Sequence, residues 1–93
     1  MPNERIANVI GLGLIGGSIS LALRRSGFVV WGSDTAGGVA SDALARGIID
    51  RVGLSPDAGI SFVATPVNTV ATSVREALDA TRGVVTDVGS VKA

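Results

Sequence analysis

Short apolar segments alternate with longer stretches of helical periodicity along this chain of 93 residues. Three compact apolar runs are bounded by polar residues or glycine, as is typical of strands buried on both faces of a parallel sheet: Ile6–Ile10, Phe28–Gly32 and Ile60–Ala64. Two shorter runs, Ile48–Val52 and Val84–Thr86, predict further strands. The pattern therefore predicts five strands.

Apolar residues recur at helical spacing in three other segments, which are Leu14–Arg25, about Gly38–Arg46, and a stretch that begins at Pro66 and ends before Gly83. The segment from Gly53 to Gly59 is rich in turn-forming residues and predicts a loop.

This alternation of strands and helices predicts a doubly wound, Rossmann-like α/β fold. Parallel strands joined by right-handed crossovers give the strand order 3-2-1-4-5, with helices on both faces of one sheet. Ligands of such sheets bind at the carboxyl ends of the strands, where the order reverses. That edge would collect residues 11–16, Asp34, Thr65, Pro66 and residues 87–90.

Three glycines follow the first predicted strand at the spacing of a dinucleotide-binding turn. In that motif the first, here Gly11, forms the tight turn, and the second, Gly13, lets the backbone approach a pyrophosphate. The third, Gly16, allows helix and strand to pack closely, and the positive end of the helix faces the phosphates.

Asp34 lies 18 positions after Gly16, where a carboxylate accepts hydrogen bonds from the adenosine ribose of such a cofactor. A carboxylate there repels a ribose 2′-phosphate, and residues 35–37 include no arginine or lysine to neutralise one. The cofactor predicted is NAD rather than NADP. The alternative is that Asp34 caps the second helix.

Two other groups at this edge allow simpler interpretations. Thr65 and Pro66 would line the cofactor, or Thr65 would only cap the helix that follows. Ser90 and the single lysine, Lys92, are not selected by spacing, since small polar residues near a chain end often form a surface loop.

The composition of the chain excludes several classes of binding site and reaction. Eight acidic residues balance eight basic ones without runs of like charge, so no surface for nucleic acid or membrane is expected. Cysteine and histidine are both absent, which excludes disulfides, thiolate chemistry and the usual zinc ligands, and no metal site is expected. The apolar stretch Val9–Leu23 lacks a cleavage site and is too short to span a bilayer, which favours a cytoplasmic protein.

With these features assembled, the chain resembles the N-terminal part of the prephenate dehydrogenase family, which includes the arogenate dehydrogenases. The resemblance covers nearly the whole chain. It is carried by five ordered motifs: Val9–Ser18, Gly32–Asp34, Ala45–Asp50, Ala64–Pro66 and Thr86–Lys92.

The resemblance implies oxidative decarboxylation of prephenate to 4-hydroxyphenylpyruvate with NAD, on the way to tyrosine, or the corresponding reaction of arogenate. It implies that Asp34 holds the adenosine ribose and that Ser90 is a catalytic residue beside nicotinamide and substrate, where it helps to orient a histidine. The pyrophosphate would be held by Gly11, Gly13 and Gly16 with the backbone of Leu14 and Ile15.

The family's catalytic histidine, its substrate-binding arginines and its helical dimerisation domain have no counterpart in these residues. We therefore expect residues 1–93 to be the cofactor domain of a longer homodimeric enzyme, and to be inactive alone. Two alternatives remain at this stage. One is another two-domain dehydrogenase, acting on 3-hydroxy acids or imines, against which the ending Asp87–Ser90 argues. The other is a non-catalytic module that senses a dinucleotide.

Overall fold

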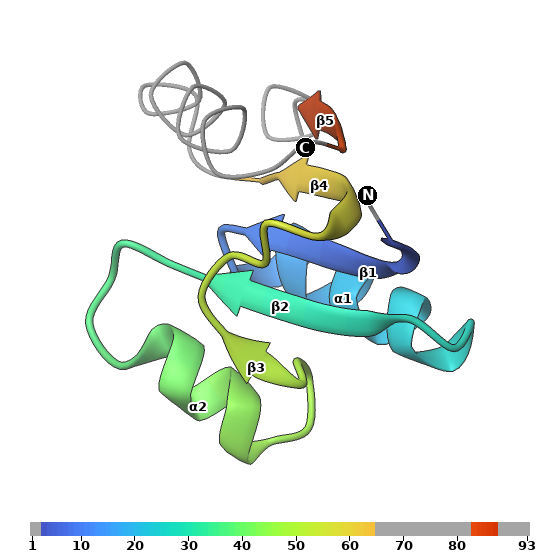
Figure 1. The fold of residues 1–93 in the computed structure, drawn as a ribbon. Helices are drawn as coiled ribbons and strands as arrows, with labels where there is room; N and C mark the ends of the chain where they lie inside the picture. Colours follow the sequence, from blue (N-terminus) through green and yellow to red (C-terminus); the bar gives the residue numbers. More distant parts are fainter. Residues whose placement is uncertain (1–2, 65–82, 88–93) are drawn as a thin grey trace.

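A five-stranded parallel sheet forms the centre of the molecule (Figure 1). The computed structural model describes residues 3–64 and 83–87. The strands are β1 (Asn3–Ile10), β2 (Val29–Ser33), β3 (Arg51–Val52), β4 (Ala58–Val63) and β5 (Val84–Asp87), in the order β3-β2-β1-β4-β5. Every neighbouring pair is parallel. The predicted strand order and fold class are confirmed.

The register of the central strands separates two faces of the sheet. Val9 of β1 lies beside Gly32 of β2 and Phe62 of β4, so these three residues share one face. Asn8 lies one residue earlier and shares the opposite face with its neighbours in β2 and β4.

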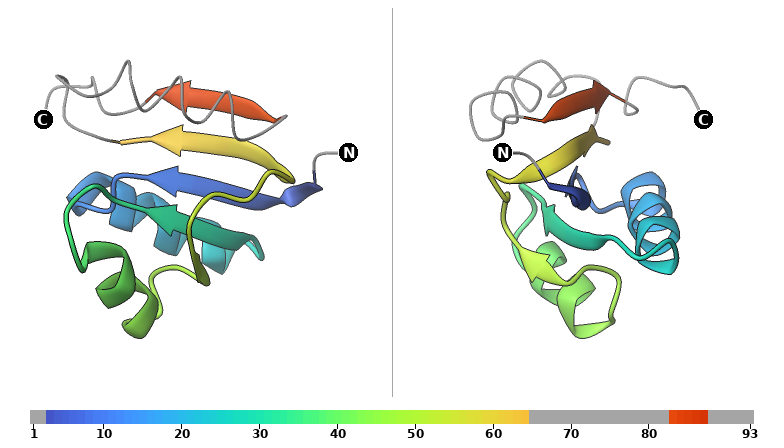
Figure 2. Two further views of the ribbon diagram at one scale, coloured as in Figure 1. Left: turned by 60° about the vertical axis from the view of Figure 1, so that its left-hand side comes forward. Right: turned by 45° about the vertical axis from the view of Figure 1, so that its right-hand side comes forward.

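Both described helices cover the Val9 face. Helix α1 (Leu14–Arg25) and helix α2 (Val39–Ala45) pack on one apolar core. The core is built from Val9, Leu12, Val30, Ala43 and Ile49, with Ile19, Leu23, Val39 and Ala40 among the residues packed against it. Figure 2 shows α1 alongside the sheet and α2 beside its β3 edge. The predicted helix that begins at Pro66 lies outside the described residues.

Each helix ends in the same hydrogen-bonded motif. After α1, the Phe28 N–H donates to the Leu23 carbonyl; after α2, the Ile48 N–H donates to the Ala43 carbonyl. Both bonds span a glycine in the left-handed region, and this pattern is the Schellman motif. The predicted end of α1 at Arg25 is confirmed, and α2 ends at Ala45, one residue before the predicted Arg46.

The opposite face has a smaller apolar cluster and a polar centre. Ile10 and Val63 are buried there, with Leu54 and Val85 packed against them. Beside them Asn8 is fully buried in the middle of the sheet. This face is therefore partly covered by the loop between β3 and β4, which carries Leu54.

Several predicted strand boundaries were wrong. β1 begins before Ile6, β2 covers Val29–Ser33 rather than Phe28–Gly32, and β4 covers Ala58–Val63 rather than Ile60–Ala64.

The strand expected at Ile48–Val52 covers only Arg51–Val52, because the Ile48 N–H is used to close α2. Gly59, expected in the loop, belongs to β4. A Cβ on Gly83 would lie 2.6 Å from the carbonyl of Gly59, so the backbones of these two residues approach closely. Asp87, expected to open a loop, is the last residue of β5.

Candidate functional site

The first strand ends in a turn that stays attached to its neighbour. Gly11 follows β1 with a φ of 93°, in a region that L side chains rarely adopt. Its N–H donates to the Ser33 carbonyl at the end of β2 (2.8 Å). The chain therefore leaves the sheet sharply while the ends of β1 and β2 remain joined.

The third glycine allows a contact that a larger residue would prevent. A Cβ built on Gly16 would lie 1.7 Å from the carbonyl oxygen of Gly11. The first turn of α1 thus packs directly on the backbone of the glycine turn. This is the close helix-strand packing predicted for Gly16 from its spacing.

The amino end of α1 is open. Its N-cap is Gly13, which supplies no side-chain hydrogen bond, and its first turn has no acidic residue. The first N–H groups of a helix have no acceptor within the helix, so those of Leu14, Ile15 and Gly16 point outward. The Leu14 side chain is 89% exposed.

Space is free at the glycine that begins this helix. A Cβ built on Gly13 meets no atom of the described residues within 4 Å. Helix N-termini attract anions through outward N–H groups and the helix dipole. The turn and the helix end therefore fit a diphosphate, and the residues predicted to hold one lie together.

Asp34 lies directly after β2 and is bonded to the same turn. Its Oδ2 accepts the Leu12 N–H (2.7 Å), and its Oδ1 accepts the Ala36 N–H (2.9 Å). Asp34 does not cap α2, whose N-cap is Gly38. The sequence indicated where Asp34 lies, but it contained no signal for the bond to Leu12.

Strand β4 ends beside the glycine turn. The Ala64 N–H donates to the Ile10 carbonyl (2.7 Å), and Val63 lies in register with Asp87 of β5. The carboxyl ends of four strands therefore form one edge. Thr65, Pro66 and Ser90, which were predicted to line it, lie outside the described residues.

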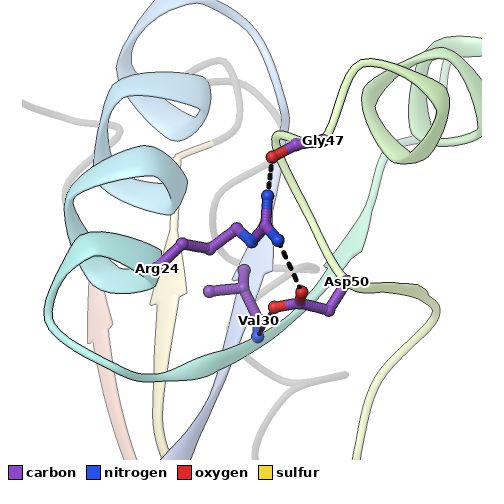
Figure 3. A network of polar contacts seen from close by, with 4 residues as sticks. All are labelled: Arg24, Val30, Gly47 and Asp50. Atoms are coloured by element: carbon purple, nitrogen blue, oxygen red, sulfur yellow. Dashed lines mark hydrogen bonds and ion pairs between the residues drawn. The ribbon is translucent and has the colours of Figure 1, made fainter.

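The Ala45–Asp50 motif contributes to a polar network at the other end of β2 (Figure 3). Arg24, in the last turn of α1, pairs with Asp50 (3.1 Å) and donates to the Gly47 carbonyl. Asp50 Oδ2 accepts the Val30 N–H (2.9 Å). These contacts join α1, β2 and the connection that follows α2, far along the strand from the glycine turn.

A buried polar group in β1 was not predicted. The side-chain amide of Asn8 donates to the Ser55 carbonyl (3.0 Å) and to Ser61 Oγ (3.1 Å), and its Oδ1 accepts the Ser55 N–H (2.8 Å). These bonds fasten the loop before β4 to the central strand. Asn8 is therefore a structural residue of the face opposite the helices.

A known family of proteins matches most of this chain. Residues 19–93 match the family model described as prephenate dehydrogenase, nucleotide-binding domain. None of the curated protein sequences is similar enough to match.

Three solved structures superpose on nearly the whole chain. The Synechocystis arogenate dehydrogenase is 31% identical, with a TM-score of 0.83, over 95% of this chain and 34% of its own. A prephenate dehydrogenase from Aquifex aeolicus, solved with hydroxyphenyl propionate and NAD+, is 29% identical, with a TM-score of 0.82, over 98% of this chain and 35% of its own. A second structure of the Aquifex aeolicus enzyme is 31% identical, with a TM-score of 0.78, over 94% of this chain and 35% of its own.

The chain spans about a third of the length of these structures. In the ranges 3–64 and 83–87, neither helix has the length and apolar character needed to cross a membrane.

Proposed function

Since the chain belongs to the prephenate dehydrogenase family, as its nucleotide-binding domain, we propose that it binds NAD for the oxidation of prephenate or arogenate. Bound NAD would accept a hydride from the substrate. Residues 1–93 form the cofactor domain in this proposal. The substrate-binding groups and the catalytic base lie on a further part of a cytoplasmic, homodimeric enzyme of tyrosine biosynthesis.

The observation that carries the proposal is the open helix end beside an ordered carboxylate. The backbone N–H groups at Leu14, Ile15 and Gly16 would hold the pyrophosphate, with Gly13 leaving room for its approach. Asp34 would accept the ribose hydroxyls. Each of its oxygens accepts one backbone N–H, so lone pairs remain for a further donor.

Support for NAD over NADP comes from the charges around Asp34. Asp34 belongs to neither of the ion pairs Arg24–Asp50 and Arg46–Asp42 of the described residues. A 2′-phosphate would meet a carboxylate that the guanidinium groups of these two pairs do not neutralise. A structure in the family also has NAD+ bound.

Calorimetric titration of the 93-residue chain with NAD and with NADP tests the proposal. We expect NAD to bind more tightly, by at least about tenfold, because the 2′-phosphate is repelled. Equal affinities would contradict the role given to Asp34, and binding of neither dinucleotide would contradict the proposal as a whole.

A matched pair of glycine variants locates the binding site. Gly13→Ala and Gly17→Ala each place a methyl group where residues 3–64 and 83–87 have no atom within 4 Å, so both are expected to fold. Only the methyl group at Gly13 lies at the predicted point of pyrophosphate approach. Gly13→Ala should weaken NAD binding at least about tenfold and Gly17→Ala should not. Equal binding by the two variants would exclude this turn as the site.

The catalytic part of the proposal is tested by absorbance at the nicotinamide band. The 93-residue chain contains no histidine to serve as the base that the family uses, and we expect no reduction of NAD in the presence of prephenate. Turnover by these residues alone would contradict that expectation. Ser90, Thr65 and Pro66 remain proposed site residues.

A further inference from the structure

The carboxylate of Asp34 and the backbone of the glycine turn form one hydrogen-bonded unit. Asp34 Oδ2 lies 2.7 Å from the Leu12 nitrogen, across 22 positions of sequence. Leu12 is the residue between the first two glycines of the turn, and it is buried. The bond therefore connects the end of β2 to the centre of the turn.

The bond matters because the Leu12 N–H has little access to water. Leu12 is only 9% exposed and packs in the main core. The bond is partly buried, and an N–H that loses its acceptor in such surroundings retains part of the cost of having left water. Removal of the carboxylate therefore disfavours the turn in its present shape.

The second oxygen of Asp34 holds the carboxylate itself in place. Oδ1 accepts the N–H of Ala36, two residues ahead, at 2.9 Å. With one N–H on each oxygen, the carboxylate has a fixed orientation. An asparagine could reproduce only one of the two bonds, because its amide nitrogen would face the other N–H donor.

We infer that Asp34 is a positioning residue for the pyrophosphate turn as well as the acceptor for the ribose. This inference rests on the proposed function, which it deepens. Its consequence is a limit on cofactor specificity: removing the acid weakens the binding of every dinucleotide, including NADP. Replacement of Asp34 alone does not convert the site.

Amide hydrogen exchange of the ligand-free 93-residue chain tests the positioning role by itself. In Asp34→Ala, exchange at the Leu12 amide should accelerate about ten- to a hundredfold more than exchange at the Val30 amide. The matched control is Asp50→Ala, which removes the acceptor of the Val30 N–H and should reverse the ratio. Equal acceleration of both amides in Asp34→Ala would overturn the inference.

Asp34→Asn provides a second variant should the alanine variant fail to fold. It keeps one of the two acceptors, and we expect a smaller rise in exchange at Leu12 or at Ala36, whichever amide faces the new NH₂ group. No selective change at either amide would overturn the inference.

Cofactor binding tests the coupling between the two roles. The probe is an NAD analogue whose adenosine ribose carries hydrogen in place of both hydroxyl groups, so that it offers Asp34 nothing to bind. Asp34→Ala should still bind this analogue about tenfold more weakly than the unchanged chain does, because the turn has lost its support. Unchanged affinity would overturn the coupling.

The hydrogen-exchange and cofactor-binding experiments test the inference and the proposed function independently. If the unchanged chain binds neither NAD nor the analogue, the proposed function fails. The exchange ratio still decides whether Asp34 holds the turn.

Discussion

The two ends of β2 each have an aspartate that accepts a backbone N–H, yet the two sites differ in what surrounds them. At the amino end, Asp50 holds the Val30 N–H and is paired with Arg24, and the guanidinium also reaches the Gly47 carbonyl (Figure 3). At the carboxyl end, Asp34 holds two backbone N–H groups and belongs neither to this ion pair nor to Arg46–Asp42. We call the amino end of β2, where Asp50 is paired with a cation, the closed end. We call the carboxyl end, where Asp34 accepts only backbone N–H groups in these contacts, the open end.

The same difference extends to the ends of α1. Its last turn has Arg24 and Arg25, whose positive charges are stabilised by the negative end of the helix dipole. The last carbonyls of the helix accept hydrogen bonds within the motif that ends at Phe28. Its first turn has neither an acid nor a side-chain cap. Within the described residues, the caps and charges therefore complete the carboxyl end of the helix, and the end without them is the one beside Asp34. The contrast indicates that one end stabilises the fold, and it supports the proposal that the other end binds a ligand.

The largest effect is expected from filling the close contact at the open end. Gly16→Ala would place a methyl carbon 1.7 Å from the Gly11 carbonyl oxygen, an overlap that neither backbone can relieve locally. We expect a loss of at least about 3 kcal/mol in the free energy of unfolding, which is much of the stability of a small domain. Denaturant unfolding measures it.

The neighbouring glycine is the control for Gly16. A methyl group on Gly17 meets nothing within 4 Å, and the residue lies inside α1. Gly17→Ala should raise the free energy of unfolding by about 0.5–1 kcal/mol, because glycine disfavours a helix interior. Similar destabilisation by both substitutions would show that the packing at Gly16 is not the cause.

The closed end is tested by removing its acid. Asp50→Ala leaves the Val30 N–H without its acceptor and Arg24 without its partner, and should lower the free energy of unfolding by about 1–3 kcal/mol. NAD affinity, measured by calorimetry on the folded protein, should stay within about twofold. A large loss of affinity would mean that the two ends of β2 are coupled, and the contrast drawn between them would fail.

Much of this arrangement could be predicted because it follows from local periodicity. The limits of α1 and the strand order follow from apolar spacing and the rules for parallel crossovers, and both are confirmed. The position of Asp34 at the sheet edge follows from its distance to the glycines. The family resemblance drawn from the motifs is likewise confirmed.

The side-chain bonds between distant segments could not be predicted. Asn8 bonds to Ser55 across 47 positions, and Asp34 to Leu12 across 22. No periodicity encodes such pairs, because they depend on which loops the finished sheet brings together. β3 was predicted too long for a related reason: the capping of α2 uses the Ile48 N–H that a longer strand would need.

The open end can be tested further by adding a cation next to Asp34. The Ala36 side chain is exposed, and its backbone N–H already binds Asp34, so Ala36→Arg places a guanidinium near the ribose site without removing that bond. We expect the ratio of NADP to NAD affinity to rise about tenfold, since arginine pairs well with phosphate. Ala45→Arg, at an exposed position of α2, is the control for added charge. An equal rise in both variants would show a general electrostatic effect.

The smallest change in the free energy of unfolding is expected from removing one of two ion pairs of similar length. Arg46–Asp42 is 2.9 Å long with side chains 70% and 61% exposed, whereas Arg24–Asp50 is 3.1 Å long with side chains 38% and 28% exposed. Arg46→Ala should cost about 0.3–0.5 kcal/mol, because water screens an exposed pair within one helix. Arg24→Ala should cost about 1 kcal/mol or more, since it also removes a bond to the Gly47 carbonyl that joins separate elements. Denaturant unfolding in low and high salt distinguishes them: salt should abolish the cost of the first substitution and leave most of the second. If the two costs were equal and equally sensitive to salt, the network at the amino end of β2 would be no more than another surface pair, and the stability of that end would have to come from its apolar packing alone.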